Sequence, residues 1–150
     1  MPEKKTIDAA RRDARQGKSA STQAGEFVRE EIHHIREGKH GARSTKQVIA
    51  IALSKARRSG VQLPASKGAS PATKKQAARE LAHAHEGHVV SSKRSRAMTK
   101  VLRREGHSAA SHASLARHAH GSAMQQGATE RSSTARKAAR TRAGKKKQAA

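Results

Sequence analysis

The scarcity of large apolar side chains constrains what this chain can fold into more than any other feature. Ile, Leu, Val and Phe together account for 17 of the 150 residues. A strongly charged chain usually needs many more such residues to form a large packed core. We therefore expect a mainly α-helical protein of short helices, with one modest ordered segment and a largely disordered basic C-terminal region.

The charge of the chain is large and unevenly distributed. The formal net charge is +22. Residues 38–150 contain 25 Lys and Arg side chains against four acidic ones, whereas residues 1–37 contain eight against seven. A surface this basic repels itself in water and attracts a polyanion, of which nucleic acid is the commonest in a cell.

The order of residue types along the chain divides it into five segments. We expect an N-terminal helix or arm over residues 1–20, a helical hairpin over 21–60 and a linker over 61–72. Weak His- and Arg-rich helical segments follow over 73–126, and a basic tail occupies 127–150. Glycines are predicted to end the successive helices; these are Gly17, Gly38, Gly60, Gly87, Gly106, Gly121 and Gly144.

Residues 21–60 show the clearest helical periodicity. In the predicted helix 22–37, apolar side chains recur at steps of three and four residues, while Glu26, Glu30 and Arg36 are expected to face water. Ser44 and Gln47 match a capping box that begins a second helix, as do Thr73 and Gln76 further along. A helix-turn-helix usually belongs to a domain of three or more helices, and the sequence shows no convincing third partner for the hairpin. The apolar positions of the first helix are Ala24, Phe27, Val28, Ile32 and Ile35.

Clusters of Lys and Arg are the candidate nucleic-acid contacts. They accompany the second helix of the hairpin, a segment near residue 100 and the C-terminal tail, and their spacing suits phosphate contact more than base reading. Phe27 is the one aromatic residue and belongs to the predicted core, which favours duplex backbone binding over base stacking. The candidates are Lys39, Arg43, Lys46, Lys55, Arg57, Arg58, Lys93, Arg94, Arg96, Lys100, Arg103, Arg104, Arg136, Lys137, Arg140, Arg142, Lys145, Lys146 and Lys147.

Other site chemistry is weakly represented. Cysteine is absent, which excludes zinc fingers and disulfides. Among the ten histidines, His83, His85 and His88 are candidate Zn²⁺ or Ni²⁺ ligands, but nearby Lys and Arg repel a cation, so we expect no metal site and no cofactor. No phosphate-binding glycine loop or catalytic pair stands out, and we expect no enzyme. No run of apolar residues is long enough to span a membrane, so we expect no membrane partner.

Two blocks, Phe-Val-Arg-Glu-Glu-Ile at 27–32 and Gly-Ala-Arg-Ser-Thr-Lys-Gln at 41–47, are distinctive. Over about residues 17–60 the chain resembles a family of small basic proteobacterial proteins of unknown function. Some members carry the labels DNA-binding or plasmid stabilisation protein. The resemblance implies a bacterial source, a short helical segment and a variable basic tail, and it supplies no catalytic residues.

These observations predict sequence-independent binding of nucleic acid, in a histone-like or nucleoid-associated manner, through contacts to the backbone of duplex DNA. The expected location is the cytoplasm, at the bacterial nucleoid. One alternative is a protein-interaction module in which the 22–37 helix binds a partner or the 21–60 hairpin self-associates. The other alternative is an RNA-binding or ribosome-associated basic protein.

Overall fold

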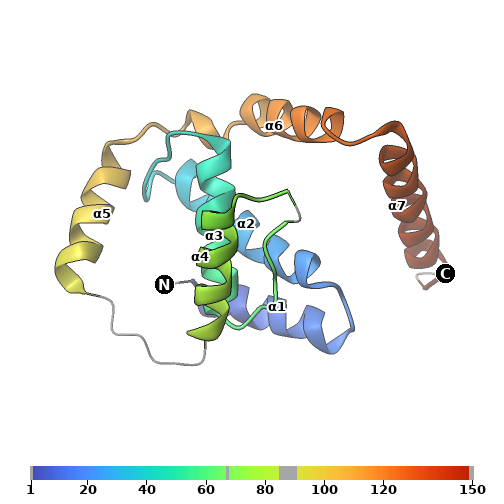
Figure 1. Cartoon of the computed structure of the whole chain (residues 1–150), viewed down its shortest axis with the longest axis horizontal. Coiled ribbons are helices and arrows are strands. Elements are labelled where there is room, and N and C mark those ends of the chain that lie inside the picture. Colours follow the sequence, from blue (N-terminus) through green and yellow to red (C-terminus); the bar gives the residue numbers. More distant parts are fainter. Residues whose placement is uncertain (1, 67, 85–90, 149–150) are drawn as a thin grey trace. The chain divides into compact units, whose positions relative to one another are not determined.

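The computed structural model describes residues 2–66, 68–84 and 91–148, and side chains as far as Gly144. It confirms the mainly helical prediction, and no strand occurs in these ranges. The chain divides into two compact units, residues 1–114 and 115–150. The elements are α1 (Lys4–Arg15), α2 (Ala20–Arg36), α3 (Thr45–Arg58), α4 (Pro71–Ala82), α5 (Ser92–Arg104), the short 3₁₀ helix η1 (Ser108–Ala110), α6 (His112–Met124) and α7 (Ala128–Gln148) (Figure 1).

Helix α2 begins and ends where local signals place it. The Ser19 side chain accepts a hydrogen bond from the Thr22 backbone N–H, and the helix terminates before Gly38, whose φ is +74°. Ala24, Phe27 and Ile35 are buried as predicted. The prediction that Glu30 faces water is wrong, because Glu30 and its neighbour Glu31 are both buried against other elements.

Helix α3 begins after Ser44 as predicted, but only half of the capping box is present. The Ser44 hydroxyl accepts from the Gln47 N–H, whereas the Gln47 amide oxygen accepts from the Arg43 N–H at 2.8 Å and not from the N–H of Ser44. The helix packs against α2 through its buried Val48, Ala52 and Ala56. Thus the predicted hairpin of two helices is present.

A third helix completes this core, although the sequence analysis did not identify a third helix that packs with the hairpin. Helix α1 packs against α2, and its Ile7 and Ala10 join the cluster around Phe27. Figure 1 shows α1, α2 and α3 close together, and α4 contacts α3. The loop between α2 and α3 spans residues 37–44, longer than the three- or four-residue turn of a helix-turn-helix.

The predicted linker 61–72 is partly structural. Val61 is buried, and its N–H bonds to the Ala56 carbonyl just after Gly60, whose φ is +93°. Helix α4 starts at Pro71 inside that segment, capped by the Ser70 hydroxyl on the Thr73 N–H, so Thr73 is not the cap. Proline is favoured in the first helical turn because a backbone N–H at that position would have no partner within the helix.

The segment before α6 packs onto the loop between α2 and α3. The Gly41 N–H donates to the Leu102 carbonyl at 2.9 Å, and the Ala42 N–H donates to the Gly106 carbonyl at 3.0 Å. A Cβ on Gly41 would lie 1.9 Å from the Glu105 carbonyl oxygen, so only glycine fits. Ala109 and Ala110 of η1 then enter a second apolar cluster with Ile35, Ala42 and Val48.

The prediction of a largely disordered basic C-terminal region is not supported, since residues 128–148 form α7. Ala, Arg, Lys and Gln have high helix propensity, and no proline follows Pro71. Gly121 and Gly144 lie inside α6 and α7 and end neither helix, and Gly106 lacks the positive φ of Gly17, Gly38 and Gly60. Gly87 is outside the described residues. None of the described helices combines the length and apolarity of a membrane span.

Candidate functional sites

Carboxylates in the N-terminal part of the chain neutralise many of the cations around them. Such an ion pair neutralises the positive charge of the Lys or Arg within the protein and reduces its attraction for an external anion. The ion pairs are Lys5–Glu3 (2.9 Å), Lys18–Asp13 (2.6 Å), Arg29–Glu26 (2.5 Å), Lys39–Glu37 (3.0 Å), Lys55–Glu31 and Arg57–Glu80 (3.2 Å).

Three of the predicted phosphate contacts of the hairpin belong to these pairs. Arg57 is 8% exposed, and its guanidinium bonds to Glu80 and to the Leu63 carbonyl. Lys55 is half-buried against Glu31, and Lys39 is exposed but bound to Glu37 and Glu3. We therefore regard Arg57 and Lys55 as structural residues.

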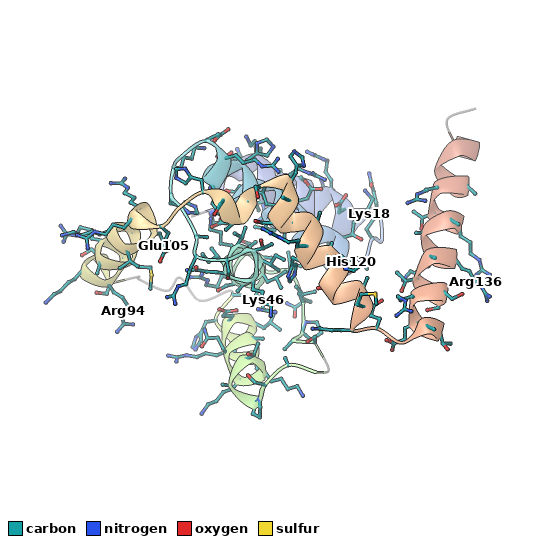
Figure 2. The ribbon with its side chains drawn as sticks, turned by 90° about the horizontal axis from the view of Figure 1, so that it is seen from above. Lys18, Lys46, Arg94, Glu105, His120 and Arg136 are labelled. Atoms are coloured by element: carbon teal, nitrogen blue, oxygen red, sulfur yellow. The ribbon has the colours of Figure 1, made fainter. Side chains whose placement is uncertain are left out.

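The other hairpin cations remain on the surface. Arg43, Lys46 and Arg58 are exposed, and no carboxylate of the described residues pairs with them. Arg58 makes only local bonds, to the carbonyl and hydroxyl of Ser54. The hairpin thus exposes Arg43 and Lys46 near the start of α3, where Figure 2 labels Lys46, and Arg58 at the end of the helix.

Helix α5 carries the densest group of cations. All six are exposed, and none pairs with a carboxylate in the described ranges. The spacing of Arg96, Lys100 and Arg103 brings them onto one face, where they line a shallow open depression with Ser95 and Thr99. The six residues are Lys93, Arg94, Arg96, Lys100, Arg103 and Arg104.

Helix α7 carries cations around its whole circumference. Their side chains are exposed as far as they are described, and Arg131 bonds to the Gln126 carbonyl at 2.6 Å. Figure 2 shows Arg136 projecting from α7 and Arg94 from α5. The predicted contacts on α7 are Arg136, Lys137, Arg140 and Arg142; Lys145, Lys146 and Lys147 lie on the same helix, with side chains outside the described part.

A cluster of carboxylates and imidazoles lies between α1, α2 and the following loop, and the sequence analysis proposed none of its carboxylates as ligands. His34 Nε2 is 2.9 Å from Glu3 Oε1 and 3.6 Å from Glu30 Oε1. His40 Nε2 is 3.3 Å from Glu31 Oε1. The i,i+3 and i,i+4 spacing of His34 from Glu31 and Glu30 was the available signal. We call these five residues the Glu–His cluster.

Hydrogen bonds to charged partners shift several pKa values. Bonds from Lys5, His34 and Lys39 lower the pKa of Glu3 to about 2, and the bond to Glu37 raises the pKa of Lys39. For Glu80, burial raises the pKa, but bonds from Ser54, Gln76 and Arg57 outweigh it and leave the pKa below its usual value.

Only one of the three histidines predicted as candidate metal ligands lies in the part of the chain that the structure describes. His83 is exposed at the end of α4, and His85 and His88 lie outside the described residues.

Comparisons with known proteins return no match: neither a family model, nor a curated protein, nor a solved structure corresponds to this chain. The family resemblance of residues 17–60 accordingly stays a prediction.

Proposed function

We propose that the chain binds nucleic acid, chiefly duplex DNA, through its phosphate backbone and without sequence preference. The observation that carries the proposal is the exposed set of cations on α5 and α7, which have no carboxylate partner among the described residues. Such side chains repel one another along a helix, and a phosphate backbone relieves that repulsion and releases counterions.

The position of the aromatic residue favours a duplex over a single strand. Base stacking requires an exposed Phe, Tyr or Trp. The chain has no Tyr or Trp, and Phe27 is fully buried between α1, α2 and α3. Contact with phosphates by Lys and Arg, with Ser95 as a neutral donor on α5, needs no such residue.

Use of the 22–37 helix as a partner-binding surface is less well supported. Its apolar side chains Ala24, Phe27 and Ile35 are buried inside the protein, against α1, α3 and η1. Binding a partner through that face would require the core to open. The cations of α5 and α7 need no rearrangement to reach an anion.

The test is the salt dependence of DNA binding by the full chain, measured by mobility shift or fluorescence anisotropy. If about eight phosphates are contacted, log Kobs against log[salt] should have a slope near −7. A variant with Arg96, Lys100 and Arg103 replaced by Gln should make the slope shallower by about 2.7, since each contact contributes about 0.9.

A control variant separates position from total charge. Replacing Lys5, Lys18 and Arg29 by Gln removes the same charge from residues that are already ion-paired, so the slope should change by less than about 1. An equal effect in both variants, or a slope for the unmodified chain shallower than about −3, would contradict the proposal. Structured RNA that displaces DNA at equal phosphate concentration would assign the surface to RNA or the ribosome.

A further inference from the structure

We propose that the Glu–His cluster binds one divalent transition-metal ion of the Zn²⁺ type. The ligand atoms of Glu31, His34 and His40 all lie within 4.8 Å of one another, as do those of Glu3, Glu30 and His34. We place the ion beside His34, which is common to both groups; binding through Nε2 would replace the hydrogen bond of this imidazole with Glu3 Oε1.

Two buried carboxylate oxygens of this cluster have no hydrogen-bond partner among the described residues and are suited to binding a cation. Glu31 is fully buried and Glu30 is 6% exposed. Glu30 Oε2 and Glu31 Oε1 accept no hydrogen bond from the residues that the structure describes. A buried carboxylate oxygen left in this state is strongly unfavourable, and proteins normally compensate it by a proton donor or a metal.

The orientation of His40 points to a metal as the compensating group. Its Nδ1 is 3.1 Å from the Gly41 carbonyl oxygen, which can only accept, so Nδ1 carries a hydrogen. In the neutral ring Nε2 then holds a lone pair, and it faces Glu31 Oε1 at 3.3 Å. Two acceptors facing each other repel, and either a proton on Nε2 or a metal ion bound to both atoms removes that repulsion. A ring nitrogen bonded to a carbonyl behind it is also the usual arrangement of a metal-ligating histidine.

The types of donor select the class of metal. Imidazole nitrogen together with carboxylate oxygen suits Zn²⁺, Co²⁺, Fe²⁺ and Ni²⁺, while Mg²⁺ and Ca²⁺ prefer oxygen alone. Lys55 occupies the second oxygen of Glu31, so this carboxylate would bind through Oε1 only. Zinc–ligand distances are about 2.0–2.2 Å, so small side-chain movements must bring the ligands inward.

Three separate elements would be joined by the ion. Glu3 precedes α1, Glu30, Glu31 and His34 lie on α2, and His40 lies in the loop that also carries Gly41. Metal binding should therefore raise the melting temperature of the chain. The sequence analysis expected no metal site, and its candidate ligands His83, His85 and His88 are not part of this cluster. The metal site is also independent of the proposed function.

The test is titration of the chelator-treated full chain with Co²⁺ and Zn²⁺, followed by Co²⁺ visible absorption, calorimetry and thermal unfolding. We expect one ion to bind to each chain, at the Glu–His cluster. His40→Ala and Glu30→Gln should each weaken it more than about tenfold and remove the thermal stabilisation. Glu30→Gln preserves the shape of the side chain and so guards against a variant that fails to fold.

Controls address the other histidines of the chain. His33→Ala removes an exposed imidazole from the same helix and should leave the Co²⁺ spectrum and affinity unchanged. A triple variant with Ala at 83, 85 and 88 should also bind normally. The proposal is overturned if no ion binds, if His40→Ala and Glu30→Gln bind as the unmodified chain does, or if only the triple variant loses the metal.

Discussion

Two neighbouring arginines of α3 allow the structural and the nucleic-acid roles of the cations to be separated. Arg57 is buried and bonds to Glu80 and the Leu63 carbonyl, whereas Arg58 is exposed and bonds only to Ser54. Replacing either by Gln removes one positive charge at nearly the same place in the chain. The two variants therefore differ in burial and partner, and share the same change in net charge.

The expected magnitudes follow from those contacts. Arg57→Gln leaves the buried carboxylate of Glu80 without its cation, and removing one partner of a buried pair costs about 3 kcal/mol. Ser54 and Gln76 still donate to Glu80, which places the cost at the lower end of the usual range. Arg58→Gln should change the free energy of unfolding by less than about 0.5 kcal/mol.

Urea unfolding followed by circular dichroism measures the first effect, and the salt dependence of DNA binding measures the second. Arg57→Gln should leave the slope unchanged, because the guanidinium is not exposed to a phosphate. Arg58→Gln should make it shallower by up to about 0.9. Equal destabilisation by the two variants, or a loss of slope confined to Arg57→Gln, would refute the assignment of Arg57 as a structural residue.

Three further predictions concern single contacts. Gly41→Ala should detach the 102–110 segment, because the new Cβ would clash with backbone atoms that no side-chain rotation can move. Hydrogen exchange at the Ala42 amide, which donates to Gly106, should then rise at least tenfold. Gly25→Ala, where a Cβ meets nothing within 4 Å on α2, should instead stabilise the protein by up to about 1 kcal/mol in urea unfolding. Folding lowers the pKa of Glu80, so its contribution to stability is present above its unfolded pKa of about 4.3 and is lost as the pH falls through the lower folded value. The free energy of unfolding should therefore decrease less between pH 6 and pH 2 in Glu80→Gln than in the unmodified chain.

Local signals in the sequence determined the helices of the hairpin and the distribution of charge. Ser44 and Gln47 start α3, and glycines with positive φ follow α2 and α3, because caps and left-handed residues act within a few positions of the helix end. The cations of α5 and α7 were equally visible, since few carboxylates accompany them in that half of the chain.

Which charged side chains face water depends on how the helices pack against one another. Helical periodicity identifies the apolar face of α2, but it does not show that α1 and the 37–44 loop also cover the flank that carries Glu30 and Glu31. Likewise, the pairing of Arg57 with Glu80 and the approach of Glu105 to Gly41 join residues far apart in the chain. A sequence pattern describes one helix against solvent, whereas the state of a charged group depends on the elements that replace that solvent.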